Sequence, residues 1–524
     1  MEREVRRLEG LGQLGFAFRT AEAGAIQSSP DEAGLFLDAK PCELFVGAQR
    51  LDDYLREAGL GWVLRLSTVL AEVDLAALTR RYQASGRKAF HPRTLLGLIV
   101  YGILNRQWSL RELKNLARRD VGAWWLCGGH QPDHSTIGKF IVLHGEILTE
   151  EFFVDLVKHL VTRLRLGPTL TAGDGTLLDA AASRFRLLWS EAAEQAAQEA
   201  RETAAAAPDD AKLKRKAELA NAAVQLGADR LARRRMHQGD AAEVKVSLIE
   251  PEAVHQRAKD RTRRLAYKPV VLANADGLIV GQRVEPSNEV SAIAPVLDQH
   301  RAIFDCVPPT LLLDGGFSSN ALWKSLVGQG IDVLCPSGRT DTDGDWQKLS
   351  SRPGKFNKRE FHYDAARDVY DCPAGRELTF AYQEHNALGL GYREYWGRQC
   401  EGCPLRSRCT DSRRGRTLKR YAGEEFREWM AQLLEHPLAR ARYRRRKVIV
   451  EPCFAELRER QGLKRFHRRG LKAVRVEFAL HCIAFNLKRA VRRLLLLIIC
   501  RGPGLRSGWR RQAPLSRRLT FRPA

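Results

Sequence analysis

Three acidic residues stand where a carboxylate could take part in chemistry. Asp174 in "TLTAGDGTLLD" and Asp314 in "TLLLDGGF" each come at the end of a short apolar, strand-like run and are followed by glycine. Glu451, in "RRRKVIVEPCFAEL", lies in a basic and apolar helical stretch directly before Pro452, which places it at an N-terminal end or at a kink. Taken alone, each acid is more often a helix cap or an ion-pair partner.

Carboxylates that converge in a basic protein have a definite chemical use. They repel one another unless cations hold them, and oxygen-only ligand sets with open positions suit Mg²⁺ or Mn²⁺. Two such ions about 3.5–4 Å apart can activate a water or a 3′-hydroxyl and stabilise the leaving oxygen in a phosphoryl transfer. We therefore expect Asp174, Asp314 and Glu451 to be catalytic and to hold two Mg²⁺ or Mn²⁺ ions.

The elements around the first two acids indicate an α/β sheet. Two β-rich runs flank the turn "NADG" within residues 267–288, and a strand, a helix and a second strand follow between residues 310 and 336. Alanine and charged residues dominate about 188–245, with Pro208 between two helix-forming stretches. This composition predicts a helical hairpin inserted into the sheet domain.

The first 165 residues are expected to be helical. "SLRELKNLARRD" (109–120) has Ser109 as an N-cap and leucines at helical spacing, and "PDHSTIGKFIVLHG" (132–145) begins with helix-start residues and carries Lys139. Two short helices joined by a loop could form a helix-turn-helix whose Lys139 contacts DNA. A helical bundle without any DNA contact explains the same pattern.

The charge points to an anionic partner. Lys and Arg number 86 against 62 Asp and Glu, which gives a net charge of +24, and residues 440–493 alone hold 18 basic and 4 acidic side chains. Nucleic acid is the commonest partner of such a chain. A membrane is the rival, but the longest aliphatic run near the C-terminus is far short of the roughly 20 residues that a span needs. With no signal-type N-terminus either, we expect a cytoplasmic, nucleoid-associated protein.

Four of the eleven cysteines form a cluster. Cys372, Cys400, Cys403 and Cys409 have the spacing C-x27-C-x2-C-x5-C, which permits a tetrahedral zinc site with four thiolate ligands. An unmetallated thiol cluster and an iron–sulfur cluster are the alternatives. The other cysteines stand mostly in apolar surroundings and are expected to fill the core.

These acid-bearing segments resemble the three motifs of DDE-type insertion-sequence transposases with a ribonuclease-H-like core. In one large class of these enzymes the glutamate lies in a helix of pattern Y-x2-R-x3-E-x6-K. Counted outward from Glu451, the basic positions of the pattern fall on Lys447 and Arg458, and the tyrosine position falls on Arg444 beside Tyr443. Residues 90–145 and "RRGLKAVRVEFALHCIAFNLKR" are also similar to parts of this group.

The resemblance implies a homodimeric or larger assembly on double-stranded DNA. It would bind terminal inverted repeats, cut at the element ends and join the 3′ ends to target DNA. Asp174 and Asp314 would hold both metal ions, and Glu451 would complete the second. Basic side chains would contact phosphates; the candidates are Arg444, Lys447, Arg458, Lys464, Arg465 and Lys139.

The expected fold class is α/β: a ribonuclease-H-like mixed sheet with a helical insertion, an all-α N-terminal domain and a small cysteine-rich insertion. The expected segments are 1–165 (helical), 166–336 (first part of the core), 337–435 (cysteine-rich), 436–500 (basic helices of the core) and 501–524 (disordered tail). Two other functions stay open. A DNA-binding protein of transposase descent, or a nuclease without strand transfer, would keep the charge and the fold, and an RNA-binding protein would explain the charge but leave the acids unused.

Overall fold

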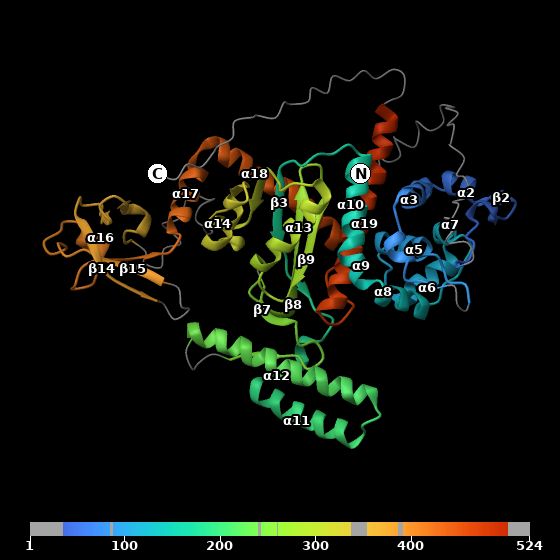
Figure 1. Cartoon of the computed structure of the whole chain (residues 1–524), viewed down its shortest axis with the longest axis horizontal. Coiled ribbons are helices and arrows are strands. Elements are labelled where there is room, and N and C mark those ends of the chain that lie inside the picture. Colours follow the sequence, from blue (N-terminus) through green and yellow to red (C-terminus); the bar gives the residue numbers. More distant parts are fainter. Residues whose placement is uncertain are drawn as a thin grey trace. The chain divides into compact units, whose positions relative to one another are not determined.

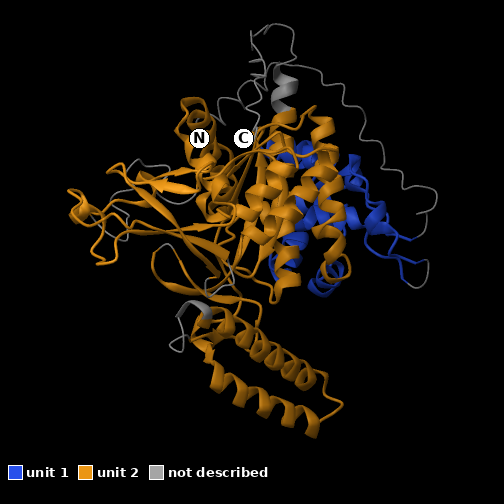
Figure 2. Ribbon diagram, turned by 60° about the vertical axis from the view of Figure 1, so that its left-hand side comes forward, with its two compact units in different colours: residues 1–102, 107–140 blue, residues 103–106, 141–524 orange. Residues whose placement is uncertain are grey.

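The computed structural model describes residues 35–83, 87–238, 243–258, 260–336, 354–385 and 391–500 (Figure 1). It divides into two compact units, one of residues 1–102 and 107–140 and one of residues 103–106 and 141–524 (Figure 2). The predicted basic tail, 501–524, lies outside the described residues.

The segment predicted as a helical domain, 1–165, does not coincide with the first unit, because residues 141–165 belong to the second unit. The described part of the first unit is built around helices. They are α2 (Leu51–Glu57), α3 (Gly61–Glu72), α4 (Ala76–Thr79), α5 (Pro92–Leu104), α6 (Leu110–Arg119), α7 (Val121–Cys127) and α8 (His134–Leu143), with a short hairpin of β1 (Phe45–Val46) and β2 (Gln49–Arg50) before them. The predicted N-cap is confirmed, because Ser109 and Glu112 form a reciprocal capping box at the start of α6. The predicted direct loop between α6 and α8 is wrong, since α7 lies between them.

A mixed sheet forms the centre of the second unit. Its strands are β3 (Thr171–Gly175), β4 (Leu178–Asp179), β7 (Val254–Arg257), β8 (Arg263–Asn274), β9 (Ile279–Glu285), β10 (Thr310–Leu313) and β11 (Asp332–Leu334). The order is β11-β10-β3-β8-β4, and β7 and β9 also pair with β8. β11, β10 and β3 run parallel, while β8 runs antiparallel to β3 and β9. The predicted hairpin is therefore confirmed, and Gly277 takes the positive φ that its turn requires.

Apart from α11 (Ser190–Ala206) and α12 (Ala211–Gln238), the described part of the second unit has eight further α-helices. They are α9 (Gly145–Thr149), α10 (Glu151–Arg163), α13 (Ile293–Phe304), α14 (Asn320–Gly328), α16 (Arg406–Cys409), α17 (Glu424–Glu435), α18 (Pro437–Ala455) and α19 (Leu471–Cys500). α13 and α19 pack against β9, and α18 packs against β3 and β8. Across the described ranges, no helix combines the length and the apolarity that a membrane crossing demands.

Buried amides fasten the helices to strand β9. Asn486 of α19 accepts a hydrogen bond from the Ile279 N–H and donates one to the Ile279 carbonyl, at 2.9 and 2.8 Å. Gln299 of α13 accepts a hydrogen bond from the Gln282 N–H at 2.8 Å. Backbone groups that face away from the neighbouring strand would otherwise be buried without partners, so these side chains close the edge of the sheet.

The alanine-rich segment forms the predicted pair of helices. α11 (Ser190–Ala206) and α12 (Ala211–Gln238) pack on each other through small buried side chains, among them Ala197, Ala200 and Ala220 (Figure 1). Strands β5 (Leu188–Trp189) and β6 (Lys245–Val246) pair antiparallel at the base of the two helices. The alternation of alanine with charge identified this hairpin in the sequence.

The cysteine-bearing region contains a sheet that the sequence did not reveal. Five antiparallel strands follow in chain order: β12 (His362–Asp364), β13 (Val369–Asp371), β14 (Glu377–His385), β15 (Gly391–Trp396) and β16 (Thr417–Tyr421). Most positions along β14 are exposed, so its apolar alternation is too faint to predict a strand.

Candidate active site

Strand pairing brings the first two acids together. β10 and β3 are parallel neighbours, and their register pairs Leu313 with Gly173. Continuing one residue along both strands places Asp314 beside Asp174. Asp174 is the penultimate residue of β3, while Asp314 follows β10 directly. Both carboxylates therefore stand at the carboxyl ends of parallel strands, where α/β sheets commonly bind ligands.

Each aspartate also binds the glycine that follows it. The Gly175 N–H donates to Oδ1 of Asp174 at 2.8 Å, and the Gly315 N–H donates to Oδ1 of Asp314 at 2.9 Å. Asp314 thereby caps the short 3₁₀ helix Gly315–Phe317. The capping role and the site role considered for this residue are thus compatible, because one carboxylate oxygen makes the cap and the other is left for a ligand.

An arginine that the sequence did not single out lies between the two acids. Arg446 Nη1 is 3.1 Å from Asp174 Oδ2, and Arg446 Nη2 is 3.7 Å from Asp314 Oδ1. Arg446 is buried, whereas half of the Asp314 side chain is exposed. A buried guanidinium between two carboxylates cancels part of their repulsion and loses part of its own hydration.

The electrostatic balance at this site is incomplete. Burial raises the pKa of Asp174, and the nearby Asp314 charge raises it too, whereas Arg446 lowers it. Among the described residues, the buried Nε of Arg446 has no hydrogen-bond partner. The pair of acids is therefore only partly neutralised by the protein, which leaves this position receptive to a further cation.

The helix pattern explains why Arg446 points inward. Arg446 precedes the buried Ile449, Val450 and Cys453 by three, four and seven residues, so all four share one face of α18. A basic residue on the apolar face of a helix must find an acidic partner. This periodicity could have identified Arg446 within the run Arg444–Lys447.

Tyr443 belongs to the same inward face. It is half-buried, and both Arg446 and Asp314 influence its hydroxyl, whose pKa is raised mainly by burial. Tyr443 and Arg446 have the Y-x2-R spacing described above. With these two residues in place, the glutamate position of the pattern falls on the buried Val450, one residue before Glu451. The alignment counted from Glu451 therefore puts two exposed residues, Arg444 and Lys447, in the auxiliary positions.

Glu451 lies inside α18, where its side chain is exposed. Of the two places expected for it, the N-terminal end of a helix is wrong, because α18 begins at Pro437 and continues through Pro452; a kink at Pro452 stays a prediction. A π-helical turn, Glu456–Arg460, follows directly after α18. Pro452 lacks the N–H that would bond to the carbonyl of residue 448, so the hydrogen-bond ladder of α18 has a gap before the π-helical turn.

The π-helical turn carries Arg458 to the strand that holds Asp174. Arg458 Nη2 donates to the Thr176 hydroxyl and to the Leu177 carbonyl, the latter at 2.7 Å. Asp174 also contributes to the electrostatic environment of Arg458. Arg458 therefore stands near the two acids, although its side chain is largely used in binding the backbone beyond β3.

The remaining predicted DNA contacts lie on the surface. Lys464 is exposed and pairs with Glu459 at 3.1 Å. Arg465 is exposed and donates to the carbonyls of Ala180 and Ala182 at 2.8 and 3.2 Å. Lys139 is exposed on α8.

Glu289, an acid that the sequence did not single out, lies against the turns that follow the two aspartates. A Cβ atom at Gly175 would come within 2.4 Å of Glu289 Oε2, and one at Gly316 within 2.3 Å of Glu289 Oε1. Glu289 also pairs with Lys268 at 3.5 Å. The glycines after both aspartates therefore make room for this carboxylate.

The four clustered cysteines surround one small cavity. All four line a space of about 20 Å³, room for a single water-sized body. Burial raises the pKa of Cys409, and the other three thiols contribute in the same direction. The N–H groups of Arg376 and Arg416 donate to the sulfurs of Cys372 and Cys400, both at 3.4 Å.

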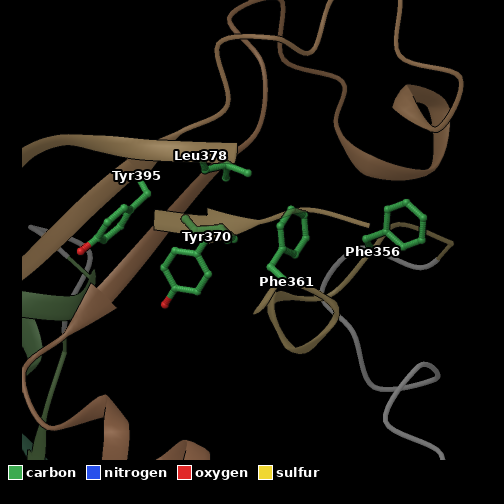
Figure 3. Close-up of a cluster of buried hydrophobic side chains, with 6 residues drawn as sticks. Phe356, Phe361, Tyr370, Leu378 and Tyr395 are labelled. Atoms are coloured by element: carbon green, nitrogen blue, oxygen red, sulfur yellow. The ribbon is translucent and has the colours of Figure 1, made fainter. Parts of the chain in front are cut away.

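An aromatic core supports this cavity. Figure 3 shows Phe356, Phe361, Tyr370, Leu378 and Tyr395 in one buried cluster, and Cys372 and Cys409 pack against it. The donor set is of the kind that zinc binds. However, among the described residues, no group of three or more His, Cys, Asp or Glu side chains is already gathered as a metal site in this conformation, so an ion at the thiols or at the acids would require these side chains to draw closer together.

Two family models match this chain. Residues 371–491 match a family described as "Transposase DDE domain", and residues 61–142 match one described as "Transposase domain (DUF772)". Together these matches indicate a DDE-type insertion-sequence transposase. A search of curated proteins finds no significant match.

The matched segments of the chain contain only part of the candidate site. The DDE match includes the four clustered cysteines, Arg446 and Glu451, but it begins only at residue 371, after the strands that carry Asp174 and Asp314. The pairing of those two acids therefore comes from the structure alone.

Replacing Arg446 should destabilise the fold in a pH-dependent way. In Arg446→Gln the two carboxylates lose their shared counter-ion, and we expect the free energy of unfolding to fall by about 1–3 kcal/mol at pH 7, less than for a fully buried pair because half of the Asp314 side chain is exposed. Arg446 lowers the pKa of Asp174, so this pKa rises further in the variant. As the pH falls through that raised pKa, Asp174 takes up a proton, the repulsion ends and the loss shrinks.

Urea unfolding at about pH 7 and pH 4 measures this effect. Arg445→Gln is the matched control, because Arg445 is exposed on the same helix. If both variants lose the same free energy of unfolding, or if Arg446→Gln loses the same amount at both pH values, Arg446 is not the counter-ion of the two acids.

Proposed function

We propose that this transposase binds double-stranded DNA at the ends of its element and catalyses metal-dependent strand cleavage and strand transfer. The supporting observation is the convergence of Asp174 and Asp314 on one cation, the guanidinium of Arg446. Two carboxylates that the fold holds together, with one of them half exposed, form an oxygen donor set suited to Mg²⁺ or Mn²⁺.

In this proposal the two aspartates and Arg446 have separate roles. When bound, a divalent ion would supply Lewis-acid polarisation of the scissile phosphate and activate the attacking oxygen. Asp174 and Asp314 would hold it through the oxygens that the Gly175 and Gly315 N–H groups leave free. Arg446 would keep the acids ionised and, as the divalent charge takes over that task, become available to a phosphate oxygen.

Glu451 remains our proposal for the third acid. It lies on α18, the helix that packs on β3 and places Arg446 at the site, and it is exposed and thus open to an ion and to DNA. The strand order β9-β8-β3-β10-β11, with the first acid in the central strand, supports the proposal of a ribonuclease-H-like core. The exposed Arg444, Lys447, Lys464 and Lys139 are proposed phosphate contacts, and a homodimer on DNA is proposed as the working assembly.

We also propose that Cys372, Cys400, Cys403 and Cys409 bind one structural zinc ion. Support comes from their shared cavity and from the N–H groups that already point at two of the sulfurs. Hydrogen bonds to sulfur favour the thiolate form that zinc requires. The ion would stabilise the five-stranded sheet between β10 and α18, and has no part in the chemistry.

The first prediction from this proposal concerns Asp314. Purified protein with Mg²⁺ should cleave duplex DNA that carries the element ends and join it to target DNA. Asp314→Asn should lower the rate by more than about 100-fold, because losing an outer-shell partner of a metal ligand already costs 10–100-fold.

Asp298→Asn is the matched control for Asp314→Asn, since Asp298 is exposed on α13. Gel analysis of cleaved and joined strands gives the rates. Tight DNA binding without cleavage by either the variant or the unchanged chain would instead indicate a DNA-binding protein of transposase descent.

Glu451→Gln tests the third acid. The substitution keeps the size of the side chain and removes its charge, so we expect normal folding, at least a tenfold slower cleavage and a higher Mg²⁺ concentration for half-maximal rate. Glu459→Gln is the control, because Glu459 is exposed on the following π-helical turn. Unchanged cleavage and Mg²⁺ dependence in Glu451→Gln would remove this residue from the site.

Cys400→Ser tests the zinc proposal. Elemental analysis should find about one zinc per chain in the unchanged protein and none in the variant, whose cysteine-bearing sheet should then unfold at a lower temperature. Cys306→Ser, which changes a half-buried thiol outside the cluster, should keep the metal. Bound iron together with visible absorbance would favour an iron–sulfur cluster. A protein that contains no metal would favour a cluster of free thiols.

A further inference from the structure

A basic hollow opens on the surface beside the N-terminus of α19. Its volume is roughly 640 Å³, and it is lined by Arg465, His467, Arg468 and Arg469, with Phe466 and Ala181 among the other contacts. Arg465, His467 and Arg469 are exposed, and Arg468 is half-buried. Lys472 adds an exposed charge on the first turn of α19.

Two buried acids shape the loop that carries these side chains. Glu477 accepts hydrogen bonds from the N–H groups of His467 and Arg468, at 3.0 and 2.9 Å. Glu250 accepts one from Gly470 at 3.4 Å and one from Ala182 at 2.8 Å. The N–H groups of His467, Arg468 and Gly470 are therefore bound inside the protein, and at these positions a ligand in the hollow would meet side chains.

The arginines of the loop lack acidic partners at contact distance. Within the described part of the chain, neither Arg468 nor Arg469 forms a side-chain ion pair, although both lie in the field of a buried acid, Glu477 for Arg468 and Glu250 for Arg469. Burial lowers the pKa of Arg468, which means that this charge has lost water without gaining a close partner. An anion in the hollow would supply that partner.

The hollow is connected to the two acids by a run of arginines along one chain segment. Beyond Asp174, Arg458 binds Thr176 and Leu177, and Arg264 lies 3.8 Å from Asp179. Arg465 then binds the carbonyls of Ala180 and Ala182 at the edge of the hollow. Arginines from other parts of the chain therefore contact the segment from Asp174 to Ala182 along its length, from the candidate active site to the basic loop.

We propose that a DNA strand leaves the active site along residues 176–182 and that its sugar–phosphate backbone is held in the hollow by Arg468 and Arg469. This inference rests on the proposed function. Residues 176–182 span at most about 20 Å at 3.3 Å per residue, the length of about six nucleotides at 3.4 Å each. The hollow thus contacts DNA a fixed short distance from the bond that is cut.

The phosphate backbone is the part of DNA that this surface suits. Guanidinium groups match phosphate oxygens in geometry and charge, and the loop presents no planar apolar platform for bases, because Phe466 is buried. Contacts of this kind position DNA without reading its sequence.

The test uses the full chain with Arg468→Gln and Arg469→Gln combined. Binding to a 40-base-pair duplex is measured by fluorescence anisotropy over a series of NaCl concentrations, once with an element end and once with random sequence. If each arginine holds one phosphate, the slope of log K against log salt becomes shallower by about 1.8. Affinity should fall roughly 10- to 100-fold, equally for both duplexes.

Arg233→Gln combined with Arg235→Gln is the matched control, because both residues are exposed on α12 and the change in net charge is the same. The control should bind with the slope of the unchanged chain, and thermal unfolding of both double variants checks the fold. A hollow variant that binds like the control overturns this inference and leaves the proposed function standing. An unchanged chain that binds neither duplex overturns the proposed function itself.

Discussion

The charge balance between one buried guanidinium and two carboxylates determines how the centre of this protein can be built. Asp174 and Asp314 are adjacent because parallel strands β3 and β10 pair, and without a cation their charges would repel. Arg446 supplies that cation from α18, so the helix must lie across the sheet in one position. The same contact suits the site to a metal ion, because a divalent ion would provide the positive charge that Arg446 provides here.

The surroundings of this contact fall into rigid and adaptable parts. The sheet is closed at β9 by buried amides, and β10 and the first three residues of β3 are buried, which fixes the positions of the two aspartates. The helix that carries Arg446 contains Pro452 and ends in a π-helical turn, so its ladder of hydrogen bonds is interrupted close to Glu451 and Arg458. The candidate functional residues thus lie where the regular sheet meets the irregular end of α18.

Sequence reasoning succeeded where local patterns are strong. The apolar runs before Asp174 and Asp314, the turn at Gly277 and the capping box at Ser109 all predicted elements that the structure contains. It failed where the decisive fact is a contact between distant segments. Nothing near Arg446 in the chain announces its partners, which lie over 130 residues away in the case of Asp314. A count of charges also cannot distinguish one buried arginine from its exposed neighbours without the periodicity of the helix.

The glycines that follow the two aspartates have an evolutionary consequence. Their missing side chains are filled by the carboxylate of Glu289, which lies against Gly175 and Gly316 at once. In an ancestor with a larger residue in place of either glycine, a shorter side chain would have had to replace Glu289, or the loop before α13 would have had to move. Across relatives of this chain, the residues at these three positions should therefore change together, and a comparison of many such sequences would show them as one covarying group.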